Sequence, residues 1–161
     1  MAAEQRTIEL QLPSSLGYER VAMEAVGAAA KLMGFHAARV EDLRTAVSEA
    51  CINAMEHGHQ FNAATKVVVA LTLGDTSLQI DVADKGKGTP DRIQPPDLTK
   101  MFSGEQQVRG WGMFLIKALM DEVQFNVRSD LGNVTRMVIR LEPSDEEHPP
   151  TRWAGASRGR V

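Results

Sequence analysis

Two carboxylates and an amide recur at helical spacing near the middle of the chain. Glu49, Asn53 and Glu56 follow one another at intervals of four and three residues, and His57 lies one turn beyond Asn53. An amide oxygen is a hard ligand that suits Mg²⁺, and a carboxylate one turn earlier can orient an incoming hydroxyl or accept its proton. The residue types therefore indicate chemistry on phosphates, whereas helix geometry alone favours a solvated polar face.

A glycine-rich turn, Asp84-Lys85-Gly86-Lys87-Gly88, follows a predicted strand that ends at Ala83. Glycines allow the backbone to approach a flat ligand closely because no Cβ intervenes. Asp84, at the mouth of this turn, can accept a hydrogen bond from an exocyclic amine. Since Asp and Gly also populate ordinary turns, the segment taken alone favours a plain connection.

A second glycine pair, in Arg109-Gly110-Trp111-Gly112, opens a predicted helix. Backbone N–H groups at a helix start, together with the helix dipole, favour a bound anion, so this segment is a candidate phosphate cradle. It is not a lysine-bearing phosphate loop, because the chain contains no Gly-Lys-Ser or Gly-Lys-Thr. It also differs from the dinucleotide fingerprint, since the third glycine is missing and a loop precedes it.

Periodicity predicts the elements that position these segments. Alternation of polar and apolar residues predicts a strand over 7–12, branched residues predict strands over 66–73 and 76–83, and a further strand pair is predicted over 122–128 and 134–141. Helical spacing predicts helices over 16–33, 37–57 and 111–121. Ser14 or Ser15 is expected to cap the first helix and Gly34 to end it. This order predicts an α+β fold, a two-layer sandwich with helices packed on one face of a mainly antiparallel mixed sheet.

Two apolar stripes are expected to bury the first two helices. The first comprises Val21, Ala25, Ala29 and Leu32, and the second comprises Leu43, Val47, Ala50, Cys51 and Ala54.

Composition narrows the class of protein. The chain has 161 residues and a formal net charge of −3, so it lacks the basic footprint of a nucleic-acid-binding protein. Cys51 is the single cysteine, which excludes an intrachain disulfide and suits a reducing compartment. No apolar stretch is long enough to cross a bilayer, and no signal peptide is evident. We expect a cytoplasmic domain over 1–142 and a disordered tail over 143–161, rich in polar residues and proline.

Taken together and in order, the three segments resemble the ATP-binding domain of the GHKL superfamily, and within it the anti-sigma-factor serine/threonine-protein kinases. The matching stretches are EACINAMEHG (49–58), DKGKG (84–88) and RGWGMFLIKALMDEV (109–123). The resemblance covers residues 7–141 and implies a Bergerat-type sandwich. It also implies a cytoplasmic kinase that uses ATP and Mg²⁺, phosphorylates an anti-sigma-factor antagonist, binds a sigma factor and forms a homodimer.

The resemblance also implies residue roles. Asn53 would coordinate Mg²⁺ and Glu49 would polarise the attacking hydroxyl. Asp84 would accept from the adenine amine in a pocket shaped by Gly86 and Gly88. Gly110 and Gly112 would meet the phosphates beneath a mobile lid over 89–109. Asn133 stands where the family often has a threonine near adenine, so Asn133 or Thr135 could fill that position, and Trp111 is bulkier than the family's usual aliphatic residue.

Three alternatives stay open from the sequence. An ATP-dependent partner switch without phosphotransfer would keep Asn53 and the glycines and need no base. A histidine-kinase or chaperone-type module would need a phospho-accepting histidine or further domains, and His36, His57, His59 and His148 offer no convincing acceptor. A metal enzyme built on His57 and His59 is disfavoured because spacing of two on a helix end points the rings apart.

Overall fold

The computed structural model describes residues 5–58, 60, 62–85, 111–130 and 132–143. These residues form a five-stranded sheet in the order β1-β2-β3-β5-β4. The strands are β1 (Arg6–Pro13), β2 (Lys66–Leu73), β3 (Ser77–Asp84), β4 (Glu122–Ser129) and β5 (Gly132–Arg140). All neighbouring strands of this described sheet are antiparallel, so the sheet is not mixed.

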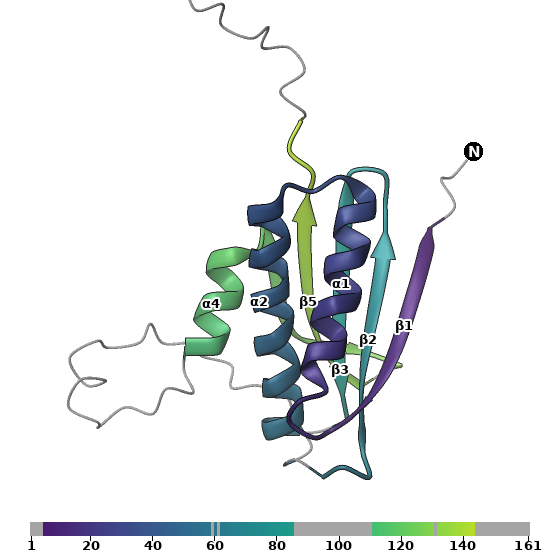
Figure 1. Cartoon of the computed structure of the whole chain (residues 1–161). Coiled ribbons are helices and arrows are strands. Elements are labelled where there is room, and N and C mark those ends of the chain that lie inside the picture. Colours follow the sequence, from purple (N-terminus) through teal and green to yellow (C-terminus); the bar gives the residue numbers. More distant parts are fainter. Residues whose placement is uncertain (1–4, 59, 61, 86–110, 131, 144–161) are drawn as a thin grey trace, which may run out of the picture.

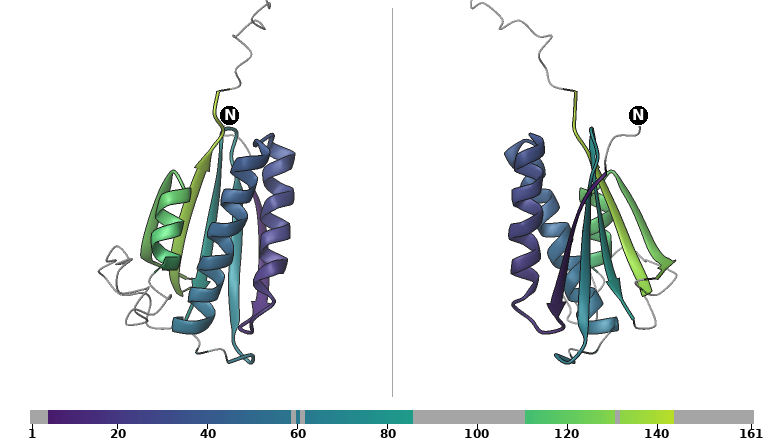
Figure 2. Two further views of the ribbon diagram at one scale, coloured as in Figure 1. Left: turned by 60° about the vertical axis from the view of Figure 1, so that its left-hand side comes forward. Right: turned by 90° about the vertical axis from the view of Figure 1, so that its right-hand side faces the viewer.

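Helices α1 (Glu19–Met33), α2 (Ala37–Asn53) and α4 (Trp111–Leu119) cover one face of the sheet. Figures 1 and 2 show α1 and α2 side by side, with α4 next to α2 on the β4 side. The predicted α+β two-layer sandwich is therefore confirmed. No helix in the described part of the chain is both long and apolar enough to cross a bilayer.

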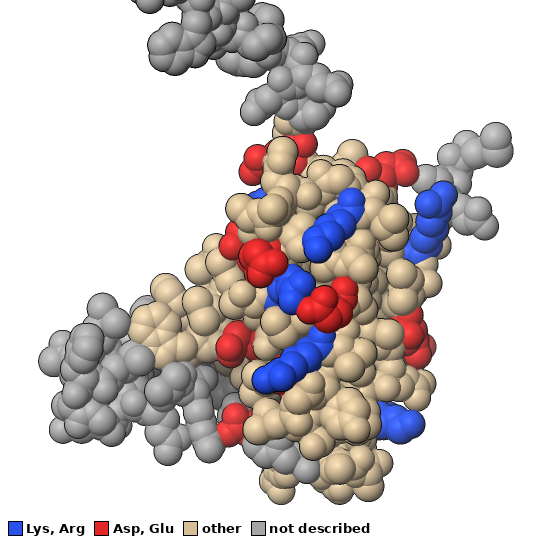
Figure 3. Space-filling view, viewed as in Figure 1, with Lys and Arg blue, Asp and Glu red and all other residues tan. Residues whose placement is uncertain are grey.

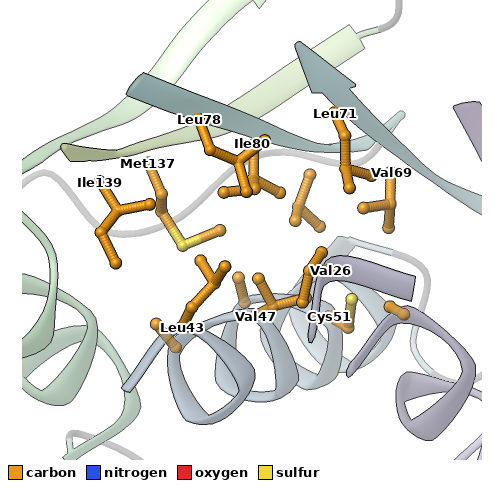
Figure 4. Packing of buried hydrophobic residues seen from close by; sticks show 14 of the residues in the cluster. Val26, Leu43, Val47, Cys51, Val69, Leu71, Leu78, Ile80, Met137 and Ile139 are labelled. Atoms are coloured by element: carbon orange, nitrogen blue, oxygen red, sulfur yellow. The ribbon is translucent and has the colours of Figure 1, made fainter. Parts of the chain in front are cut away.

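The core lies between the helices and the sheet, and the alternation of the strands explains it (Figure 4). Val69 and Leu71 of β2 and Leu78 and Ile80 of β3 point toward the helices and are fully buried. Residues of one parity face one side of a strand, so the branched residues of these strands form a continuous apolar surface. Each such side chain contributes roughly 1.5–3 kcal/mol when it is fully buried.

Helix α2 confirms its predicted stripe. Leu43, Val47, Ala50, Cys51 and Ala54 are all buried. The regular helix is shorter than predicted, because it ends at Asn53 and continues as a π-helical turn over Ala54–Gly58. Such wider turns are rare and often occur at functional sites. Here the change of helix type falls directly after Asn53, one of the residues singled out by its chemistry.

Helix α1 corrects two expectations. It begins at Glu19 with Tyr18 as N-cap and without a side-chain cap bond, so neither Ser14 nor Ser15 caps it. It does end at Gly34, as predicted. The buried face is Ala22, Val26, Gly27, Ala29 and Ala30, whereas Val21 and Leu32 are 49% and 85% exposed. Small residues allow α1 to lie close to α2 and the sheet, and this close packing selects the smaller of two apolar stripes.

Opposite charges alternate over the helical layer (Figure 3). Arg44 of α2 contacts Glu24 of α1 at 2.5 Å and Glu41 of its own helix at 3.8 Å. Arg39, also on α2, contacts Asp121 at 2.8 Å and donates to the carbonyl of Leu119 at 3.1 Å. Since Leu119 is the last residue of α4, Arg39 fixes the C-terminal end of that helix against α2.

Candidate active site

The start of α4 lies directly against the polar residues of α2. Gly112 is buried, and a Cβ placed on it would lie 2.7 Å from Oε2 of Glu49. The same Cβ would lie 3.3 Å from Nδ2 and 3.5 Å from Oδ1 of Asn53. The structure therefore brings together Glu49, Asn53 and Gly112, which the sequence had placed in two separate segments.

Glu49 and Asn53 are half-buried, which differs from a fully solvated polar face. Burial removes water from the carboxylate and raises the pKa of Glu49 above its ordinary value. A proton-accepting group works best when its pKa lies near the working pH, so this shift suits a general base. Glu56, expected on the same face, lies in the π-helical turn and is also half-buried.

Asp84 is the last residue of β3 and lies opposite Asn133 of β5 in the strand register. Both side chains are buried, at 9% and 6% exposure, on the face of the sheet that carries the helices. A buried carboxylate and a buried amide side by side offer acceptors and donors for the edge of a flat, polar ligand. Thr135, the other candidate for this position, lies two residues further and opposite Val82.

Gly132 enforces this pairing, and its role was not predicted. Its φ is +113°, and a Cβ there would lie 2.2 Å from the carbonyl oxygen of Asp84. Neither the conformation nor the space admits a side chain, so the first residue of β5 can lie directly against the last residue of β3. The residue types at 130–132 predict only a turn, because the approach of Gly132 to Asp84 depends on strand pairing.

The remaining predicted site residues lie outside the described part of the chain. These are Gly86, Gly88 and Gly110, together with the proposed lid over 89–109. The backbone of His57 belongs to the π-helical turn, and His59 is not among the described residues. Within the described ranges, no group of three or more His, Cys, Asp or Glu side chains could hold a metal ion.

Comparison with known proteins decides the family. Residues 12–139, more than half of the chain, match the histidine kinase-like ATPase domain. The serine-protein kinase RsbW of Oceanobacillus iheyensis is 33% identical over 124 residues, which cover 74% of this chain and 78% of that protein. The serine-protein kinase RsbW of Bacillus pumilus is 31% identical over 150 residues, with 89% and 91% covered. The chain belongs to the RsbW family of serine-protein kinases.

A solved structure supports the same fold. The crystal structure of the RsbU and RsbW domains of Rv1364c from Mycobacterium tuberculosis superposes with a TM-score of 0.61 at 21% identity. The match covers 86% of this chain and 33% of that longer one. The resemblance inferred from three short segments is thus confirmed at the level of family, fold and enzyme class.

Proposed function

We propose that this chain transfers a phosphoryl group from Mg-ATP to a serine or threonine of an anti-sigma-factor antagonist, and that it also binds a sigma factor as part of a bacterial partner switch in the cytoplasm. One observation carries the site: the carboxylate of Glu49 and the amide of Asn53 converge on Gly112 at the start of α4. Family membership supports the reaction class, and this convergence supports the residues that perform it.

The residues fit a bound nucleotide. Gly112 allows two oxygen-bearing side chains to lie against the backbone at the start of α4, where a Cβ would overlap with them. The first turn of α4 directs N–H groups toward an anion, and the amide oxygen of Asn53 is a suitable ligand for Mg²⁺, which commonly binds through few protein ligands and substrate phosphates. Asp84 and Asn133 would hold the adenine ring of the nucleotide, since both are buried at neighbouring strand positions.

Bound Mg-ATP would supply the phosphoryl group, and the protein's own contribution is to hold and deprotonate the acceptor. Glu49 would orient the serine or threonine hydroxyl and accept its proton as the oxygen attacks. The burial that raises the pKa of Glu49 makes it a stronger base than an exposed glutamate. Glu49 would thus act as the catalytic base, and Asn53, Asp84 and Gly112 as nucleotide-binding residues, together with Gly86, Gly88 and Gly110.

Phosphotransfer is tested with labelled ATP. Proteins captured from a bacterial lysate on the immobilised chain, with and without ATP, are identified by mass spectrometry, and the recovered acceptor is used as substrate. Glu49→Gln should bind nucleotide like the wild type and transfer roughly 10²–10⁴-fold more slowly. Glu41→Gln is the matched control, because Glu41 lies on the same helix with a 70% exposed side chain. Transfer by Glu49→Gln at the wild-type rate would refute the role of Glu49 as the catalytic base.

The same experiment separates the alternative function. If the wild-type chain binds Mg-ATP and retains its partners but labels none of them, the chain is an ATP-dependent partner switch without phosphotransfer. Release of a sigma factor upon addition of ATP or of the antagonist would support the anti-sigma activity. Capture of neither protein under any nucleotide condition would contradict it.

We propose further that two copies associate through β1 and α1. Three large side chains on or next to α1 are exposed although they are apolar or aromatic: Tyr18 by 44%, Val21 by 49% and Leu32 by 85%. Exposed apolar surface of this kind favours a protein interface. Sedimentation should show a dimer for the wild type and a monomer for a Val21→Lys, Leu32→Lys variant. An unchanged dimer in the variant would exclude this surface.

A further inference from the structure

The contact at Gly112 is tighter than close packing alone requires. A Cβ at this position would lie 2.7 Å from Oε2 of Glu49, well inside the usual carbon–oxygen contact distance. Nδ2 of Asn53, at 3.3 Å, would also be closer than an ordinary contact and would have to shift by a few tenths of an ångström, whereas Oδ1, at 3.5 Å, lies at an ordinary distance. The carboxylate of Glu49 therefore occupies space that exists only because residue 112 has no side chain.

Helix α4 is anchored from its middle to its C-terminal end. Ile116, in the middle of α4, is fully buried, and Met120, just after the helix, is 6% exposed. At this C-terminal end Arg39 donates to the carbonyl of Leu119 and to the carboxylate of Asp121. The end of the Glu49 side chain, by contrast, turns about single bonds. A methyl group on residue 112 would therefore displace the carboxylate rather than the helix.

We propose that Gly112 is a positioning residue for phosphotransfer, because its missing side chain allows the carboxylate of Glu49 to lie against the first turn of α4. This inference rests on the proposed role of Glu49 as base. It adds a second role, which acts through Glu49, to the proposed contact of Gly112 with the phosphates. A side chain at residue 112 should therefore slow phosphotransfer more than it weakens nucleotide binding, because it would approach Glu49 more closely than Asn53.

The substitution Gly112→Ala should be tolerated by the fold and costly to the reaction. Alanine is a better helix residue than glycine, which offsets the adjustment of a flexible side chain. A misplacement of the base on the order of 1 Å can slow a reaction by about 10²-fold. We expect transfer at saturating Mg-ATP to fall by about that factor and nucleotide affinity to fall much less, since the methyl group would lie 2.7 Å from Oε2 of Glu49 and 3.3 Å from Nδ2 of Asn53.

Gly27→Ala is the matched control. Gly27 is also a buried helical glycine, on α1, and its Cβ would meet the flexible side chain of Arg44 at 3.4 Å, an ordinary contact. Both variants are compared with the wild type by thermal unfolding, by titration with a fluorescent ATP analogue and by single-turnover transfer to the recovered acceptor. Gly27→Ala should match the wild type in all three measurements. Gly112→Ala should match it in unfolding, bind the nucleotide somewhat more weakly and lose far more in transfer.

A double variant tests whether Gly112 acts through Glu49. In the Glu49→Gln background the addition of Gly112→Ala should slow transfer no further, because the base has already been removed. If the two substitutions together slow transfer by the product of their separate effects, the inference would be overturned. A loss of nucleotide affinity that accounts for the slower transfer would overturn it too. Normal transfer by Gly112→Ala together with slow transfer by Glu49→Gln would overturn the role of Gly112 and leave the role of Glu49 intact. Normal transfer by Glu49→Gln would refute both the role of Glu49 as base and the role of Gly112.

Folding provides a separate test. If Gly112→Ala does not fold, the combination Gly112→Ala with Glu49→Ala should restore folding, because it removes the overlapping carboxylate. Restored folding would support the contact between these two residues. A double variant that still fails to fold would show that the methyl group meets something other than Glu49, and would overturn the inference.

Discussion

Replacement of Gly132 by alanine tests how the end of β3 is held. The φ of +113° would strain any side-chain-bearing residue, at a cost of about 1–3 kcal/mol. The added methyl group would also lie 2.2 Å from the carbonyl oxygen and 3.1 Å from the carbonyl carbon of Asp84. These are backbone atoms that cannot rotate away, so overpacking adds about 1–3 kcal/mol. The free energy of unfolding should therefore fall by roughly 2–6 kcal/mol, a large part of a typical domain's stability.

Gly17→Ala separates the two contributions, because Gly17 has a similar φ of +105° and no atom within 4 Å of its Cβ position. Urea unfolding followed by circular dichroism should give Gly17→Ala the strain cost alone. Gly132→Ala should lose a further ~1–3 kcal/mol and bind ATP more weakly, because the overlap displaces Asp84. If Gly132→Ala is no less stable than Gly17→Ala, the close approach to Asp84 is wrong.

Three further predictions follow from burial and ion pairing. Glu49→Gln should be more stable than the wild type at neutral pH. Because the pKa of Glu49 is raised in the folded state, the wild type is most stable below the pKa of an unfolded glutamate and loses stability as the pH rises through the folded pKa. Urea titrations of both proteins from acid to neutral pH measure this difference, and equal stability throughout would contradict it. Burial, with a smaller effect of the Glu19 carboxylate, raises the pKa of Cys51 to about 12, so a thiol reagent should label Cys51 only as fast as the protein unfolds; rapid labelling of the native state would contradict the packing. Arg39→Ala should lower the free energy of unfolding by about 1–2 kcal/mol and speed amide exchange in α4 while leaving exchange in α1 unchanged. Equal protection of α4 in both proteins would show that Arg39 does not hold the end of this helix.

The fold was predictable wherever the residue pattern of a segment was compatible with a single element and a single buried face. Residues 66–73 are rich in β-branched side chains and are followed by the Gly74-Asp75 turn, so the predicted strand and β2 have the same bounds. Helix α1 was harder, because its alanines give two apolar stripes at helical spacing and only packing against α2 decides which is buried. The π-helical turn after Asn53 was not predicted either, since local periodicity does not distinguish it from a regular helix.

The candidate site was predictable in its residue types and only partly in its geometry. The spacing of Glu49 and Asn53 placed them on one helical face, and the resemblance to a known family linked them to Gly112. The near-contact between Gly112 and the carboxylate, and that between Gly132 and Asp84, depend on how distant elements pack. No local pattern in a single sequence reports such distances.

The central claim is that the amide of Asn53 helps to hold Mg-ATP beside Glu49 and Gly112. Calorimetric titration of ATP into the wild type and Asn53→Ala, each with Mg²⁺ and again with a chelator, tests it most directly. The wild type should bind ATP tightly only with Mg²⁺, and Asn53→Ala should lose this Mg²⁺-dependent binding while it unfolds at the wild-type temperature. Equal affinity of both proteins for Mg-ATP would contradict the claim.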